Sequence, residues 1–157
     1  FEGIMTTHKP TGFTVSGAVD DIWVTPNESL IIIDYKSTSK DERIEALGDS
    51  PWKQQYTRQL GVYRWLLEQN GFTVEEIGYL VYANADKAAD AFDDRLIFET
   101  TLVEVPTTTD WIEDTLLAIK ECLESDELPA TGEQCEYCPY REAAGKKLQA
   151  VHFANRK

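Results

Sequence analysis

The stretch LIIIDYK, residues 30–36, decides the fold, because four aliphatic residues run directly into an acid, a tyrosine and a lysine. A continuous aliphatic block is typical of a strand buried on both faces, so we expect a central strand of a sheet. Side chains alternate along a strand, which places Asp34 and Lys36 on one face and Tyr35 on the other. The strand is therefore predicted to end in an acid and an amine side by side.

A second strand is predicted just upstream. Residues 13–24 are rich in β-branched and aromatic side chains, and the turn-forming residues 26–29 separate them from the aliphatic block. We expect the two strands to form a hairpin. Such a hairpin brings Asp20 close to Asp34, so that two carboxylates and a lysine converge.

A helix is predicted after a polar loop. Ser50 can cap it with Pro51 at the first helical position, and Asn70-Gly71 supplies a stop after Gln69. Apolar residues recur along this segment at helical spacing. They are Tyr56, Leu60, Val62, Tyr63, Leu66 and Leu67.

Two further strands and a second helix follow. The strands are expected over residues 77–83 and 95–105, and Asp110 with Glu113 resembles a capping pair for the helix. Its apolar stripe comprises Ile112, Leu116, Ile119 and Leu123. A short basic helix is expected over residues 142–153. The order of two strands, helix, two strands and helix predicts an α/β sandwich with a central mixed sheet flanked by helices.

Length and composition favour one soluble domain. The 157 residues are 42% hydrophobic, which is enough to build a core, and the longest apolar run is too short to cross a bilayer. The chain starts without a signal peptide pattern, and its three cysteines do not suggest a disulfide framework, so we expect a cytoplasmic protein. Because it begins with Phe1, we expect a fragment of a longer chain.

The net charge of −13 opposes a nucleic-acid partner at long range. Many of the acids fall in residues 86–94 and 121–133, where a solvated face is the simplest interpretation. A site built of carboxylates also adds negative charge that divalent cations neutralise. The charge therefore weighs against nucleic acid without excluding it.

The acidic strand ends carry a possible metal site. Mg²⁺ and Mn²⁺ prefer oxygen ligands, which Asp20, Asp34 and the backbone carbonyl of Tyr35 supply. The ammonium of Lys36 would stabilise the negative charge of a phosphate transition state. For the short D-x-K motif alone, a surface ion pair between Asp34 and Lys36 is the simpler interpretation.

Three motifs in order resolve that ambiguity. Gly17-x-x-Asp20, the aliphatic strand ending in D-x-K, and Gln59-x-x-x-Tyr63 on the following helix resemble the RecB-type, CRISPR-associated exonuclease-like branch of the PD-(D/E)XK nuclease superfamily. The resemblance implies a restriction-endonuclease-like fold, with Asp20 and Asp34 as metal ligands and Lys36 as a catalytic residue. It also implies that Gln59 and Tyr63 line the site or touch the nucleic acid. The match of Gly17 selects Asp20 over Asp21, which strand alternation turns away.

The tail over about residues 128–157 resembles the cysteine tail of iron–sulfur nucleases in this branch. It carries a possible residual cysteine site at Cys135 and Cys138, but alanine stands where a third late cysteine is expected, near Ala143 or Ala144. Cys122 is expected to be an ordinary buried thiol. We therefore expect no iron–sulfur cluster, and zinc would lack ligands for the same reason. His8 is expected in a loop and His152 in packing or at the surface, and neither is assigned as a ligand.

Together these features predict a single nuclease domain over residues 1–157. Its expected activity is Mg²⁺- or Mn²⁺-dependent cleavage of DNA, as an exonuclease or flap-type endonuclease in recombination, repair or defence, with a helicase or another recombination or defence protein as a possible partner and no membrane association. One alternative is a catalytically inactive nuclease-fold domain that binds DNA or acts as a scaffold. The other is a different hydrolase or metal-binding protein. Candidate phosphate contacts are Lys40, Arg43, Lys53, Arg58, Arg64, Arg141, Lys146 and Lys147.

Overall fold

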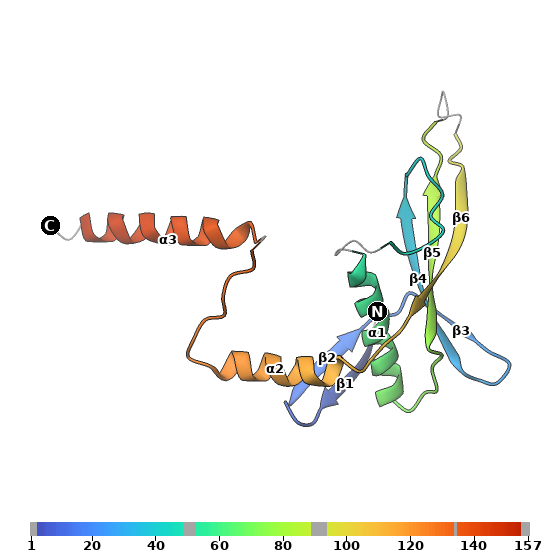
Figure 1. The fold of residues 1–157 in the computed structure, drawn as a ribbon, viewed down its shortest axis with the longest axis horizontal. Coiled ribbons are helices and arrows are strands. Elements are labelled where there is room, and N and C mark those ends of the chain that lie inside the picture. Colours follow the sequence, from blue (N-terminus) through green and yellow to red (C-terminus); the bar gives the residue numbers. More distant parts are fainter. Residues whose placement is uncertain (1–2, 49–52, 89–93, 134, 155–157) are drawn as a thin grey trace. The chain divides into compact units, whose positions relative to one another are not determined.

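The computed structural model describes residues 3–48, 53–88, 94–133 and 135–154. The chain divides into two compact units, Phe1–Ala118 and Ile119–Lys157. Figure 1 shows the elements in chain order. They are β1 (Ile4–His8), β2 (Phe13–Gly17), β3 (Asp21–Val24), β4 (Leu30–Thr38), α1 (Gln54–Gln69), β5 (Ile77–Ala85), β6 (Phe98–Pro106), α2 (Ile112–Glu124) and α3 (Tyr137–Ala154). The assignment of the whole chain to one nuclease domain stays a prediction.

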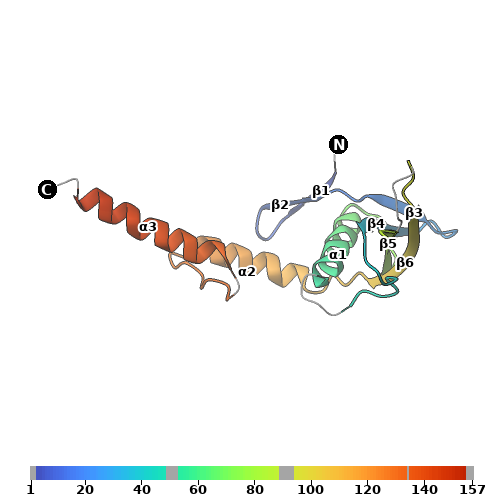
Figure 2. The same cartoon turned by 90° about the horizontal axis from the view of Figure 1, so that it is seen from above.

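A mixed four-stranded sheet forms the centre of the first unit. Its order is β3-β4-β5-β6, with β4 parallel to β5 and the two edge strands antiparallel to their neighbours. Helix α1 connects the parallel pair and packs against β4 and β6 as well as β1 and β2, and it lies beside both sheets in Figures 1 and 2. The predicted α/β architecture with a central mixed sheet is confirmed, and it fits a restriction-endonuclease-like fold.

The aliphatic block of β4 is buried on both faces, as its composition predicts. Ile32 and Ile33 point to opposite sides of the strand, and both are almost completely inaccessible to solvent. On the α1 side, Ile32 joins a cluster that includes Leu60 of α1 and Leu80 of β5. This packing fixes the position of the polar residues that follow Ile33 along the strand.

The predicted single strand over residues 13–24 is wrong in one respect, since it forms two strands in different sheets. β2 pairs with β1 in a two-stranded sheet, whereas β3 pairs with β4. The change of direction follows Gly17, where a Cβ would lie 2.8 Å from the ring of Tyr63. Only glycine allows β2 to approach α1 so closely before the chain turns into β3. The short strand β1 was not predicted, because its pairing with β2 leaves no local signal.

The helices also differ from prediction at their ends. α1 begins at Gln54 with Lys53 as its N-cap residue, whereas Ser50 and Pro51, where the start was predicted, lie outside the described residues. Its end at Gln69 agrees with the prediction. α2 is buried at Ile112, but Leu123 is 71% exposed, so the apolar stripe is covered only near its start. α3 is longer than predicted and begins already at Tyr137.

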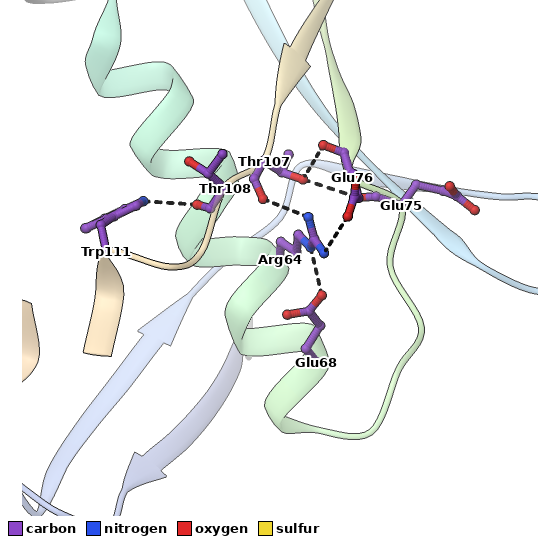
Figure 3. A network of polar contacts seen from close by, with 7 residues as sticks. All are labelled: Arg64, Glu68, Glu75, Glu76, Thr107, Thr108 and Trp111. Carbon is purple, nitrogen blue, oxygen red and sulfur yellow. Dashed lines mark hydrogen bonds and ion pairs between the residues drawn. The ribbon is translucent and has the colours of Figure 1, made fainter. Parts of the chain in front are cut away.

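A polar network joins α1 to the loop between β6 and α2 (Figure 3). The guanidinium of Arg64 donates to the backbone carbonyl of Thr107 at 3.1 Å and to the Glu68 carboxylate at 2.7 Å, with Glu76 at 4.0 Å. Thr107 is fully buried, and its hydroxyl donates to the backbone carbonyls of Glu75 and Glu76. Arg64 therefore has a structural role, which removes it from the candidate phosphate contacts.

Gly61 allows α1 to approach the same loop, because a Cβ there would lie 2.5 Å from the carbonyl oxygen of Thr108. We expect Gly61→Ala to lower the free energy of unfolding by about 1–3 kcal/mol, the usual cost of overpacking. Gly145→Ala is the matched control, since a Cβ at Gly145 meets open space within α3 and should be neutral or slightly stabilising. Denaturant unfolding of both variants measures the difference, and equal stabilities would contradict the close approach.

Candidate active site

Asp34 and Lys36 lie on the α1 side of β4. Asp34 is 1% exposed, and its Oδ2 atom lies 2.5 Å from Nζ of Lys36. The Lys36 ammonium also lies 4.7 Å from the ring centroid of Tyr56 on α1, within the range of a cation–π interaction. The lysine is thus held between a buried carboxylate and an aromatic ring, which fixes its charge at one point of the site.

Asp20 faces Asp34 across the strand pair. Asp21 is paired with Ile33, so the same register extended by one residue sets Asp20 opposite Asp34. A carboxylate oxygen of Asp20 accepts a hydrogen bond from the backbone N–H of Tyr35 at 3.0 Å. The structure therefore places Lys36 and Asp20 each beside Asp34, and the predicted roles of the three residues stay predictions.

The neighbouring acid, Asp21, serves the other face of the sheet. Its carboxylate accepts a 2.7 Å hydrogen bond from the hydroxyl of Tyr35, a side chain that points away from Asp34 and Lys36. This bond is the main reason that the pKa of Asp21 is lowered and that of Tyr35 raised. Adjacent acids thus occupy different environments because strand alternation separates them.

The Asp34 carboxylate lies in an environment that disfavours its charge. Burial raises the pKa of Asp34, the hydrogen bond and the charge of Lys36 oppose this shift, and the negative charge of Asp20 adds to it. Asp34 Oδ2 contacts the Lys36 ammonium and has no other polar partner among the described residues. A buried carboxylate oxygen with spare acceptor capacity beside a second carboxylate suits a divalent cation.

The donor set decides which cations fit. Within the described parts of the chain, no three His, Cys, Asp or Glu residues are grouped as a metal site. Zinc generally takes four protein ligands in structural sites and three in catalytic ones, whereas Mg²⁺ is held by one or two carboxylates, with water and substrate phosphate completing its shell. Asp20 and Asp34 fit Mg²⁺ or Mn²⁺. The backbone carbonyl of Tyr35 stays a predicted third ligand.

Gln59 and Tyr63 lie on the α1 face that borders this site. The side-chain amide of Gln59 donates to the hydroxyl of Tyr63 at 2.9 Å, and the Tyr63 ring packs against Gly17, three residues before Asp20. Tyr56, one turn before Gln59, reaches Lys36. Tyr56 was predicted only as a packing residue, although its helical spacing from Gln59 and Tyr63 could have indicated that it faces the site. Contact of Gln59 or Tyr63 with substrate stays a prediction.

The family follows from comparison with known proteins. A family model described as the PD-(D/E)XK nuclease superfamily matches residues 1–143. The chain belongs to the PD-(D/E)XK nuclease superfamily. No curated protein and no solved structure matches the chain. Members of this superfamily are generally nucleases that use divalent metal ions, which agrees with the paired carboxylates and the lysine of β4.

The histidine of β1 has a structural role in this superfamily member. His8 was wrongly expected in a loop, because it ends β1 and is buried. Its ring nitrogens lie 2.7 Å from the Thr11 hydroxyl and 2.6 Å from the Glu113 carboxylate, so His8 links β1 to the start of α2. Glu113, expected in a capping pair, thus contacts a histidine.

No helix in the described ranges is long and apolar enough to span a membrane.

The cysteine tail belongs to the second compact unit. Cys122 is exposed, so its expected burial is wrong. The thiols of Cys135 and Cys138 lie 3.0 Å apart, where a hydrogen bond between them lowers the pKa of Cys135 and raises that of Cys138. The described residues supply no further His, Cys, Asp or Glu to make a metal-binding group with this pair. The pair remains a possible cysteine site, as predicted.

The raised pKa of Asp34 makes a prediction for the metal-free protein. Folded protein keeps the Asp34 proton at a pH above the ordinary value of 3.8, where the unfolded chain has released it. The buried charge therefore costs stability at neutral pH, and we expect Asp34→Asn to raise the unfolding midpoint by a few degrees. The wild type should regain stability relative to the variant as the pH falls through the raised pKa.

Thermal unfolding in EDTA between about pH 7 and about pH 4 measures this difference. Asp21→Asn is the matched control with the opposite sign, because the lowered pKa of Asp21 contributes stability above its unfolded value that is lost on acidification. If the unfolding midpoints of the wild type and Asp34→Asn change with pH in parallel, the buried charge of Asp34 does not lower the stability of the protein.

Proposed function

We propose that this chain is a divalent-metal-dependent DNA nuclease that hydrolyses phosphodiester bonds, as an exonuclease or a flap-type endonuclease. The observation that carries the proposal is the buried carboxylate of Asp34, which contacts Lys36 and lies close enough to Asp20 to be affected by its charge. A carboxylate so placed costs stability, and such a cost is typical of a functional site. Membership of the superfamily supports the same activity.

Each residue of the proposed site has a separate task. Asp20 and Asp34 would hold Mg²⁺ or Mn²⁺, which supplies Lewis acidity and neutralises charge on the scissile phosphate when bound. Lys36 presents its ammonium to the charge that develops on the phosphate oxygens. The Tyr35 N–H holds the Asp20 carboxylate in place, and Tyr56 confines Lys36. Because these partners orient the charges before substrate arrives, little reorganisation is needed during reaction.

The RecB-type branch and a role in recombination, repair or defence are also part of the proposal. The order of Gly17-x-x-Asp20, Asp34-x-Lys36 and Gln59-x-x-x-Tyr63 supports the branch. The packing of Tyr63 against Gly17 supports a connection between the first and the third motif. A helicase or another recombination or defence protein remains the proposed kind of partner.

Cleavage of end-labelled single- and double-stranded DNA with Mg²⁺, Mn²⁺ or EDTA tests the proposal. We expect Asp34→Ala, Lys36→Ala and Asp20→Asn each to reduce cutting by at least about 100-fold, which corresponds to about 2.7 kcal/mol or more of lost transition-state stabilisation. Asp21→Asn is the matched control, because it removes an adjacent carboxylate on the other face of β3 and should leave cutting unchanged. Folded wild-type protein that cuts nothing with either metal would instead favour an inactive DNA-binding or scaffolding domain.

Metal binding is measurable without cleavage. Millimolar Mg²⁺ or Mn²⁺ should raise the thermal unfolding midpoint of the wild type, because a ligand that binds only the folded state stabilises it by mass action. Asp20→Asn should lose most of this shift, and Asp21→Asn should retain it. An equal shift in both variants would place the cation elsewhere on this acidic protein.

A further inference from the structure

A pocket of about 210 Å³ opens beside the candidate active site, at the end of β4 and the start of α1. We call it the lysine pocket. It is lined by Lys36, Ser37, Thr38, Lys40, Ile44, Lys53, Tyr56 and Tyr82. Lys36 belongs to both places, since its ammonium also contacts Asp34. The lysine pocket is therefore continuous with the residues proposed to hold the metal ion.

The charge of this pocket is opposite to that of the chain as a whole. Among the described residues that line the pocket, three are lysines and none is an aspartate or a glutamate. The whole chain, by contrast, carries 28 acids against 15 lysines and arginines. Ammonium groups that line one cavity raise its local positive potential, which favours the entry of an anion. Positive charge next to a carboxylate site suits a phosphate backbone, because lysines neutralise its negative charge.

The start of α1 adds to this positive potential. Lys53 is the N-cap residue and makes no side-chain capping bond, and the first turn of α1 contains no acidic residue. The backbone N–H groups of a helix N-terminus give it a partial positive charge, which acids usually offset. Here the N-cap position carries Lys53, which lines the pocket and adds its own positive charge to this end of the helix.

The loop that carries Lys40 is held by β5. The side chain of Asn84 accepts a hydrogen bond from the Lys40 N–H at 2.8 Å and donates one to the Lys40 carbonyl at 3.0 Å. This pair of bonds fixes the backbone from which the Lys40 side chain reaches the pocket. The site is thus built on β4, α1 and an anchored loop, which makes it a defined position for a ligand.

The size and lining of the pocket limit what it takes. Its volume is below the about 300–1,000 Å³ typical of drug-sized ligands, so one small charged group is a better fit than a whole base pair. The hydroxyls of Ser37 and Thr38 can donate hydrogen bonds to phosphate oxygens. The side chain of Ile44 and the rings of Tyr56 and Tyr82 give an apolar side suited to a sugar.

We propose that the lysine pocket binds a phosphate group of the nucleic-acid strand close to the phosphate that is cut, with Lys40 and Lys53 as positioning residues. This inference rests on the proposed function and adds to it. Lys36 would act on the scissile phosphate, while the two other lysines hold the strand so that this phosphate reaches Asp20 and Asp34. Positioning of this kind contributes to rate because it converts a loose encounter into one oriented complex.

Binding of a fluorescent single-stranded oligonucleotide in EDTA tests the pocket without any requirement for cleavage. The variants are Lys40→Ala, Lys53→Ala and the double variant, with Lys9→Ala in the exposed turn after β1 as the matched control. Removing one lysine that binds phosphate should reduce the slope of log affinity against log salt by about 1, so the slope of the double variant should fall by up to about 2. Lys9→Ala should retain the wild-type slope.

Oligonucleotides in which single internal phosphates are replaced by neutral methylphosphonates identify the phosphate that the pocket binds. One replacement near the cut site should weaken wild-type binding and have no further effect on the double variant. A second set of oligonucleotides differs only in the presence of a terminal phosphate. If the affinity responds to the terminal phosphate alone, the pocket binds strand ends rather than internal phosphates.

The outcomes separate the two proposals. An unchanged salt slope in the double variant, or an equal response of wild type and double variant to every replacement, would overturn the lysine pocket even if the protein cuts DNA. A reduced slope in the double variant of a protein that cuts nothing would support the pocket and count against the nuclease activity. Circular dichroism of each variant confirms that a change in binding does not come from unfolding.

Discussion

The rest of the site depends on a carboxylate buried at the end of an aliphatic strand. The four aliphatic residues before Asp34 draw β4 into the centre of the sheet, and the acid is carried into the interior with them. A charge in that position loses hydration and requires compensation. Lys36 provides part of it from the same face of the strand, and the spare capacity of Asp34 Oδ2 leaves room for a divalent cation.

Helix α1 is the element that converts this strand end into a site. Its Tyr56 contacts Lys36 of β4, and its Tyr63 packs against Gly17 at the end of β2, three residues before Asp20. Helix α1 is itself held in place through Gly61 and Arg64, which contact the loop after β6. Packing far from the carboxylates therefore helps to position Lys36, because α1 carries the Tyr56 ring that this lysine contacts.

The distribution of charge reconciles an acidic protein with a phosphate-bearing substrate. The excess of acids acts over the whole surface and is screened within about 10 Å at moderate salt. In the proposed phosphate site, the lysines of the pocket would act at contact distance, where the positive end of α1 adds to their potential. Net charge thus limits the rate of encounter more than it limits what the site can bind.

The sequence by itself determined the central strand, the mixed α/β architecture, the face shared by Asp34 and Lys36, and the motifs of the superfamily. These features depend on alternation, helical spacing and short-range composition, which are local properties of the chain. Tertiary structure alone decided that residues 13–24 divide between two sheets, that His8 contacts Glu113, that Arg64 serves an internal network, and that three lysines share one pocket. These features depend on contacts between residues far apart in the chain. Local sequence patterns do not predict the free energy of such contacts.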